Sequence, residues 1–482
     1  MASVDELKAP LQIEPVVGSR ARALLAKPAS VFVVLSLAFG MITLILTPPL
    51  RGPDEPAHFF RIYAITQGEI VPATADANGR KGMFLPYRLY QDFEFFDARR
   101  GKLFEKGFSY RSVLDEYRQR PAPADGPPVF VLYAGSEGYN PVSYLPFVAG
   151  ALLARLANLD FAGSLLLMRL AGLITMTMVI AYAIAIVPRF GWTFLFIGML
   201  PAALYGRAVI SPDGAALAYT MVVVALYLRV ALGMDPEKPW RQSLWMALCV
   251  LCKPPQLAFI LLAAITRPPR QLLSHRRAVA LIVLPAAVLS ILWATMGSVD
   301  VAAWRYYEGA QLPKEQFDPV WKLRYMLEHP LHFPSQMLAD IRDIDRLWSQ
   351  LIGILGWLDT GLRAWVYPVL SIILIGVSFV RLELDRRSRH WIALVAAVTV
   401  LGYVLAHYLI FYLAWTPIGS NRVEGVQGRY FVMALPVAAL GLGASVNRAP
   451  AVVVTALLAS SGAILSGVAV VEAILRVDWP PV

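Results

Sequence analysis

Long apolar stretches recur along the whole sequence, and the first runs from Ala29 to Leu46. A stretch of this kind is long enough to cross the hydrocarbon core of a bilayer. With 57% hydrophobic and only 16% charged residues over 482 positions, a water-soluble fold could not cover so much apolar surface. We therefore expect an all-α polytopic membrane protein with about eleven transmembrane helices, since helices satisfy their own backbone hydrogen bonds in lipid.

The flanks of the first apolar run predict its orientation. Arg20, Arg22 and Lys27 precede the run, and an excess of basic residues is typical of cytoplasmic flanks. No small-residue cleavage site follows Leu46, so we expect a retained helix rather than a signal peptide. The predicted segments are a cytoplasmic tail at 1–28, the first transmembrane helix at 29–50, a first extracytoplasmic loop at 51–160, a transmembrane bundle at 161–297, a second extracytoplasmic loop at 298–363 and C-terminal transmembrane helices at 364–482.

Two adjacent acids follow directly after the first apolar run. Asp54 and Glu55 lie between Pro53 and Pro56, which restrict the backbone on both sides. Carboxylates are costly inside hydrocarbon, so a pair at the rim of a span is either part of a solvated loop or a reactive group facing a cavity. From the residues alone, the simpler interpretation is a surface helix whose first acids complement the helix dipole.

The same segment is expected to form a helix. Asp54 is a favourable N-cap residue, and the helix would run to about Gln67, where Gly68 would end it. Asp54, His58 and Arg61 would lie on one face because they are spaced at i, i+4 and i+7. The apolar stripe beside them predicts an amphipathic helix in the membrane interface.

Three motifs occur in order along the chain: PDExxHFxR at 53–61, GWLDT at 356–360 and GVQGRYF at 425–431. An acidic pair directly after the first span resembles the signature of the GT-C superfamily of membrane glycosyltransferases, with the lipid A aminoarabinose transferases and the protein O-mannosyltransferases as distant relatives. The three motifs together more closely resemble a large bacterial membrane family placed in that superfamily. The resemblance implies a GT-C-like fold with interfacial helices in the first loop, in the bacterial inner (plasma) membrane, and an extracytoplasmic active site.

The stretch 140–156 leaves two topologies open. It is apolar but short for a span, and Pro146 and Gly150 interrupt it. If it crosses the membrane, everything after it is inverted until 242–266. If it lies on the outer surface, 242–266 must be a hairpin that turns at Lys253–Pro255.

We choose the surface helix, because the relatives carry paired interfacial helices in this loop. A crossing at 163–187 and a return at 192–210 would then bring Asp213 to the same side as Asp54. Both topologies place the basic segment 267–277 in the cytoplasm.

Further charged residues lie near the predicted outer ends of spans. Asp213 would cap the span that follows it, and the relatives have an acid at this place too. Lys253 precedes two prolines in an apolar segment, where a lysine either reaches to the interface or binds an anion. Arg422 and Arg429, with Gln427 between them, follow a later span. Paired arginine donors suit a phosphate, and a salt bridge with a neighbouring acid would explain them equally well.

These residues together suit sugar transfer from a lipid phosphate, which needs a base for the acceptor proton and positive charge for the departing phosphate. The resemblance implies a polyprenyl-phosphate sugar as donor, and a cell-envelope glycan, lipid-linked saccharide or other acceptor. We expect Asp54 to be the catalytic base of an inverting transfer, with Glu55 orienting the acceptor or tuning the base. The candidate substrate-binding residues are His58, Arg61, Asp213, Lys253, Arg422, Gln427 and Arg429.

Two other classes of function stay open. A transporter or flippase of lipid-linked saccharides predicts inverted repeats and charges near the bilayer midplane, and we find no internal repeat. A non-catalytic envelope-assembly protein would leave Asp54 replaceable.

The sequence predicts no metal site and requires no cofactor. Cys249 and Cys252 form a CxxC inside an apolar run, where packing is the expected role, and the six histidines are scattered. A divalent ion held by carboxylates, as in oligosaccharyltransferases, stays open. The net charge of +10 lies mostly in loops predicted to be cytoplasmic, which suits a lipid bilayer with anionic lipid rather than nucleic acid.

Overall fold

The computed structural model describes residues 27–100, 102, 105, 108–235, 238–266, 276–307 and 312–480. Most of the predicted N-terminal tail and most of the basic segment 267–277 therefore lie outside the described residues. The described chain is mostly helical, with two small two-stranded sheets, which confirms the all-α membrane class. Seven of its helices are long and apolar enough to cross a membrane, so the predicted count of about eleven is not confirmed.

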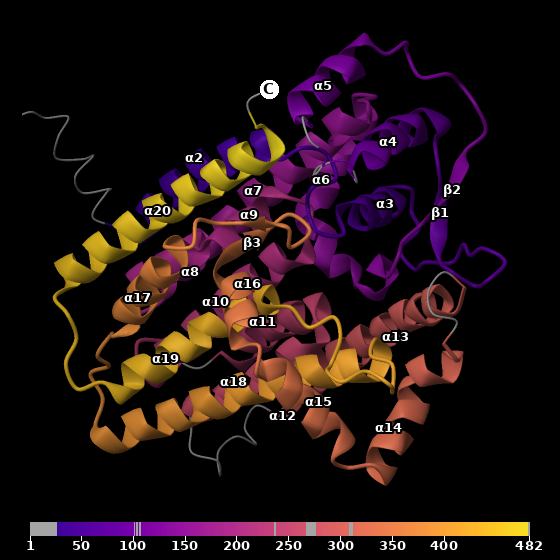
Figure 1. Cartoon of the computed structure of the whole chain (residues 1–482). Coiled ribbons are helices and arrows are strands. Elements are labelled where there is room, and N and C mark those ends of the chain that lie inside the picture. Colours follow the sequence, from indigo (N-terminus) through magenta and orange to yellow (C-terminus); the bar gives the residue numbers. More distant parts are fainter. Residues whose placement is uncertain are drawn as a thin grey trace, which may run out of the picture.

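The apolar elements form one elongated bundle (Figure 1). In chain order they are α2 (Pro28–Leu46), α7 (Phe161–Ile186), α8 (Gly191–Met199), α9 (Pro201–Ala208), α10 (Pro212–Ala231), α11 (Pro239–Cys252), the 3₁₀ helix η3 (Pro254–Ile265), α12 (Arg276–Ala278), the π-helical η5 (Val279–Val283), α13 (Leu284–Tyr307), α17 (Val366–Ser378), α18 (Arg386–Ala414), the 3₁₀ helix η7 (Gly428–Ala434), α19 (Leu435–Ser445) and α20 (Val452–Asp478).

The other elements are α3 (Glu55–Thr66), β1 (Gly82–Leu85), α4 (Tyr87–Arg100), α5 (Tyr110–Gln119), β2 (Val129–Leu132), η1 (Ser136–Gly138), η2 (Pro141–Tyr144), α6 (Leu145–Leu156), η6 (Lys314–Phe317), α14 (Pro319–Glu328), α15 (His332–Ile341), α16 (Ile344–Gly353), β3 (Ile354–Leu355) and β4 (Thr360–Gly361). Of these, the elements of the first loop lie at the upper right of Figure 1, α14 and α15 lie below them beside α13 and α18, and α16 and β3 lie near the centre of the view. Both sheets are antiparallel: β1 pairs with β2 from Gly82 opposite Leu132, and β3 pairs with β4.

Helix α2 and helix α20 run side by side in the same direction (Figure 1). Trp479, directly after α20, donates a hydrogen bond from Nε1 to the carbonyl of Leu46 at the end of α2 (2.7 Å). Helix α7 runs in the opposite direction. Arg169 near its start donates to the carbonyl of Thr47, which follows the end of α2. The last turn of α7 approaches Gly191, which lies against Pro28 at the start of α2. We call the two ends of the bundle the Asp54 end and the Pro28 end.

The chain returns to the Asp54 end through broken helices. Helices α8 and α9 meet at Leu200 and Pro201, since proline cannot continue the hydrogen-bond ladder of α8. After them, the backbone N–H of Ile210 reaches Glu55, so the predicted return at 192–210 is confirmed. Ser211, rather than Asp213, caps α10, so the prediction that Asp213 is the cap is wrong.

The segment 242–266 is a hairpin that turns at Lys253, as predicted. Helix α11 ends at Cys252, where Lys253 reaches Asp213 at the Asp54 end. The 3₁₀ helix η3 then runs back, and Trp391 near the start of α18 donates to the carbonyl of Ala264 (2.8 Å). Each limb is shorter than a full span, which is one reason why the count of long helices falls below the predicted number.

Helix α6 fits the choice of a surface helix for 140–156. Its 12 residues extend about 18 Å, too short to cross a bilayer. Gly150 allows its close packing on α7, because an added Cβ atom would lie 2.5 Å from the carbonyl oxygen of Leu167.

Helix α3 begins at Glu55 and ends before Gly68 (φ 95°), as predicted, but it is not an amphipathic surface helix. His58 and Arg61 on its polar face are buried, and so are the apolar residues beside them. Phe59 packs on Phe161 of α7 with ring centroids 4.6 Å apart. The helix is therefore held inside the protein, between the bundle and the elements of the first loop.

A buried ion pair holds α3 on α7. Arg169 donates from Nε and Nη2 to the two carboxylate oxygens of Glu55 (2.7 and 2.6 Å), and it also donates to the carbonyls of Thr47 and Pro48. Glu55 accepts further hydrogen bonds from the N–H groups of Gly52 and Ile210. Both charges are therefore fully paired although neither side chain is more than 2% exposed.

We predict that Arg169→Met lowers the free energy of unfolding by about 3–5 kcal/mol, because it leaves Glu55 as an unpaired buried carboxylate. Thermal unfolding in detergent, followed by tryptophan fluorescence, measures the change. Arg118→Met is the control, since Arg118 and its partner Asp115 are both mostly exposed and such pairs contribute little. Equal effects of the two variants would contradict this account of α3.

Candidate functional site

Four charged side chains from separate parts of the chain meet where α3 begins. Lys253 forms an ion pair with Asp213. Arg429 Nη2 lies 3.6 Å from Asp54 Oδ2, and Arg429 Nε lies 3.8 Å from Asp213 Oδ2. The predicted convergence of Asp54 and Asp213 on one end of the bundle is thus confirmed, and Lys253 and Arg429 join them.

A cavity of about 320 Å³ lies beside this charged cluster. Its polar side is formed by Asp54, His58, Lys253 and Gln427. Two aromatic rings, those of Tyr139 and Tyr430, also line it, and Lys253 Nζ lies 4.6 Å from the centre of the Tyr430 ring. Part of the remaining wall is apolar and comes from α13 and α18, with Ala294, Ile410, Phe411 and Ala414, although His407 of α18 and Ser136 line the cavity as well.

Asp54 is the accessible acid of the cluster. Its side chain is 53% exposed, compared with 17% for Asp213. Its backbone has a left-handed φ of 54°, and its carboxylate makes no capping hydrogen bond to α3, so the predicted capping role is wrong. N-cap residues normally have an extended backbone. Strained backbone of this kind persists only where surrounding contacts hold it, often at functional sites.

Two polar atoms of the GVQGRYF segment are buried and have no hydrogen-bond partner among the described residues. They are Oε1 of Gln427 and Nε of Arg429. Such an atom costs about 1–3 kcal/mol when it stays unpaired. Since Gln427 lines the cavity and Arg429 faces its acids, a ligand that offers both a donor and an acceptor would satisfy the two atoms.

His58 contributes a neutral ring to the cavity. Its Nδ1 lies 2.8 Å from the hydroxyl of Tyr144, and its ring meets that of Tyr139 edge to face. Burial lowers the pKa of His58 to about 4, against the opposing charges of Asp54 and Asp213. At neutral pH the side chain is therefore a hydrogen-bonding group rather than a cation.

Three predicted site residues lie elsewhere. Glu55 is buried against Arg169 and has no free surface toward a substrate. Arg61 is buried as well, and it donates to the carbonyls of Glu69 (2.8 Å) and Ile70. Arg422 is 52% exposed, with the carboxylate of Asp343 at 3.8 Å. None of the three predicted residues is among those that line the cavity.

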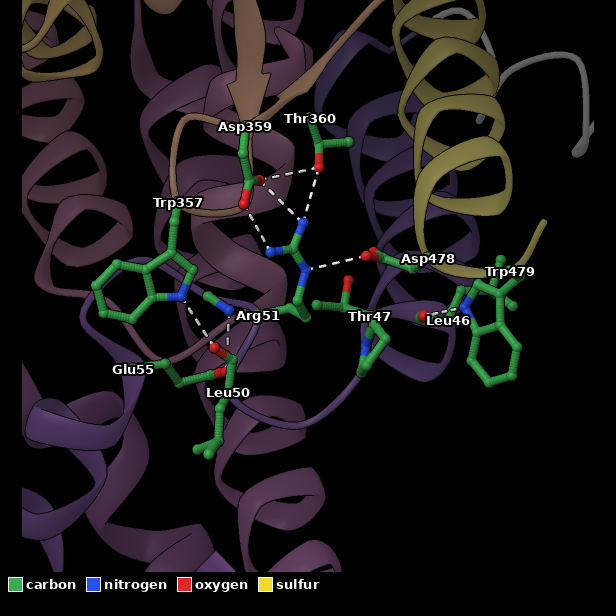
Figure 2. Close-up of polar contacts among 12 residues, drawn as sticks. Leu46, Thr47, Leu50, Arg51, Glu55, Trp357, Asp359, Thr360, Asp478 and Trp479 are labelled. Carbon is green, nitrogen blue, oxygen red and sulfur yellow. Dashed lines mark hydrogen bonds and ion pairs between the residues drawn. The ribbon is translucent and has the colours of Figure 1, made fainter. Parts of the chain in front are cut away.

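Sequence reasoning missed the residue that anchors the loop before Asp54. Arg51 is buried at the centre of Figure 2, and its guanidinium donates to both carboxylate oxygens of Asp359 (2.8 and 2.9 Å), to Thr360 and to Asp478. Trp357 adds a hydrogen bond to the carbonyl of Leu50. The GWLDT motif and the end of α20 therefore hold the start of the first loop.

Asp359 is thus a partner of Arg51, and it does not cap the next helix, although an acid shortly before a predicted span is a common N-cap. That helix, α17, begins two residues later than expected and has no side-chain cap. The sequence did contain signals for both anchors: Arg51 lies shortly after the end of the first apolar run, and Arg169 interrupts a later one. An ionisable residue in such a place requires a partner, but the sequence does not name the partner.

A family model described as "Predicted membrane protein (DUF2142)" matches residues 37–440, a range that includes all three motifs. The chain belongs to this family. No curated protein and no solved structure matches it. The description of DUF2142 is that of a membrane protein in a lipid bilayer, and it assigns neither the GT-C superfamily nor an activity. Within the described part of this DUF2142 chain, no group of three or more His, Cys, Asp or Glu side chains could hold a metal ion.

We predict that His58 makes the stability of the protein depend on pH below neutrality. Its pKa is about 4 in the folded state and 6.5 in the unfolded chain, so the unfolded state takes up the proton first as the pH falls. The full stability is present above pH 6.5, and about 3 kcal/mol is lost between pH 6.5 and pH 4. When thermal unfolding is measured across this range, the unfolding temperature of His58→Gln should fall less steeply with decreasing pH than that of the unchanged protein. His390→Gln, at an exposed position, should keep the slope of the unchanged protein.

Proposed function

We propose that this protein is a membrane glycosyltransferase that moves a sugar from a polyprenyl-phosphate donor to an acceptor bound at the Asp54 end. The observation that carries the proposal is the cavity at that end, where an accessible carboxylate lies within ion-pair distance of arginine and beside an apolar wall. The three features match the three parts of the reaction: a base, a site for phosphate and a surface for a lipid chain.

Asp54 is the better candidate for the base. Asp213 is engaged by Lys253 and approached by Arg429, while Asp54 has one long contact with Arg429 and is half exposed. An accessible carboxylate can approach the hydroxyl of an acceptor, whereas a tightly paired one cannot. Glu55, the other acid of the motif, serves as the support of α3 in this proposal.

The leaving group would be held by Arg429 and Lys253. A guanidinium can donate two parallel hydrogen bonds to phosphate oxygens, and Nε of Arg429 has no hydrogen-bond partner among the described residues. Gln427 would accept a hydrogen bond from a sugar hydroxyl. The apolar residues of α13 and α18 would lie along the first isoprene units of the donor.

In the reaction, Asp54 takes the proton of the acceptor hydroxyl while the acceptor oxygen bonds to the anomeric carbon. The bond from that carbon to the phosphate oxygen breaks, and the phosphate leaves as an anion beside Arg429. A single base on the acceptor side favours inversion at the anomeric carbon. Asp213 keeps Lys253 and Arg429 in position between turnovers.

We predict that Asp54→Asn reduces transfer about 10²–10⁴-fold without loss of protein in the membrane, because the amide cannot accept the acceptor proton. Mass spectrometry of surface glycans and lipid-linked sugars measures transfer in a deletion strain that carries each variant. Asp125→Asn is the matched control, since Asp125 is an exposed loop acid away from the cavity.

Accumulation of a lipid-linked sugar together with loss of a glycan modification would support the transferase. Full complementation by Asp54→Asn would contradict it and favour a transporter or an assembly protein.

A further inference from the structure

A second cavity, of about 1010 Å³, lies at the Pro28 end of the bundle. It is formed where α2 and α20 begin, where α7 turns into α8, and where α17 ends. The 19 residues of α2 separate it from the Asp54 end by about 28 Å, close to the thickness of the hydrocarbon core. The two cavities thus lie at opposite ends of the membrane-spanning helices.

Four basic side chains line this second cavity: Lys27, Arg189, Arg381 and Arg448. No acid is among its described lining residues. Arg189 pairs with Glu383 (2.6 Å) at the rim, but the other three form no ion pair with a described residue. Four cations that line one cavity with a single acidic partner among the described residues repel one another, so the cavity favours an anion.

The backbone around the cavity adds to this positive field. The first residues of α2, α8 and α20 all line it, and none of these helices has a side-chain hydrogen bond at its N-cap. A helix N-terminus carries partial positive charge and free N–H groups. These ends alone would not define a site, but here they surround the same space as the four cations.

The walls of the cavity are apolar and continue onto the outside of the bundle. Trp192 and Phe379 line it, and Val452 and Val453 at the start of α20 are 72% and 68% exposed. Tryptophan is typical of the membrane interface, where its ring contacts both lipid and head group. An anion that suits this cavity therefore carries hydrocarbon chains.

We propose that this cavity binds an anionic phospholipid, with its phosphate held by Arg381, Arg448 and Lys27 and its acyl chains along α2 and α20. Basic pockets between transmembrane helices bind multiply charged lipid head groups in this way. The inference does not depend on the proposed glycosyl transfer, because none of these residues belongs to the Asp54 cavity.

Binding can be measured on the full chain in nanodiscs of phosphatidylcholine, to which phosphatidylglycerol, cardiolipin or inorganic phosphate is added, by native mass spectrometry and by the shift in unfolding temperature. We expect the anionic lipids to bind and to raise the unfolding temperature. Arg381→Gln/Arg448→Gln should weaken this binding about thirtyfold, the factor for two arginine contacts of usual strength at an anionic surface.

Arg324→Gln/Arg342→Gln is the matched control, because it removes the same charge from exposed positions at the other end of the bundle. It should bind the anionic lipids like the unchanged protein. Equal losses in the two double variants, or equal binding of phosphatidylcholine and phosphatidylglycerol, would overturn the proposal. Saturation by inorganic phosphate alone at the affinity of the lipid would also overturn it, in favour of a soluble anion.

Discussion

Two buried arginines hold the first loop on the helix bundle, and the arrangement of the charged cavity depends on them. Arg51 pairs with Asp359 and Asp478, and Arg169 pairs with Glu55. A buried guanidinium that loses its partners is strongly destabilising, so each of these two arginines fixes several segments in one arrangement. Asp54 lies between Arg51 and Glu55, so its left-handed backbone is held from both sides. The contacts of Arg51 and Arg169 therefore hold a strained backbone that would relax in a loop without them.

The three sequence motifs consequently have different tasks. GWLDT supplies Asp359 and Thr360 to Arg51 and has no charged side chain in the Asp54 cavity. GVQGRYF supplies Arg429 and Gln427 to the charged cluster and the cavity. The first motif does both, since its Glu55 anchors the helix and its Asp54 faces the cavity. Residues of a motif need not all contact a substrate, and an adjacent acid pair can divide into one support and one accessible group.

The sequence alone predicted those features that depend on residues close together in the chain, such as helix ends and turns. The limits of α3 follow from its prolines and Gly68, and the turn at Lys253 follows from two prolines that cannot continue α11. The meeting of Asp54 and Asp213 followed from counting crossings after the resemblance had favoured a surface helix for 140–156. The rest depends on partners far apart in the sequence: Glu55 is buried because Arg169 lies opposite it, 114 positions away. The predicted count of about eleven spans is not confirmed, because the limbs at 192–210 and 242–266 are broken or 3₁₀ and do not form single long helices.

The two cavities differ in how their cations are paired, and this difference has a mechanistic consequence. At the Pro28 end the cations have few acidic partners, so an anion can enter without displacing a side chain. At the Asp54 end Arg429 already lies between two carboxylates at 3.6 and 3.8 Å. Under the proposed function, a donor phosphate that takes the hydrogen bonds of Arg429 draws that arginine away from Asp54. Because the contact with Asp54 is long and half exposed, it is easily given up, whereas Asp213 keeps Lys253. Donor binding would thus free Asp54 to act as the base only when the donor phosphate is in place. In this way Arg429 would couple departure of the phosphate to removal of the acceptor proton.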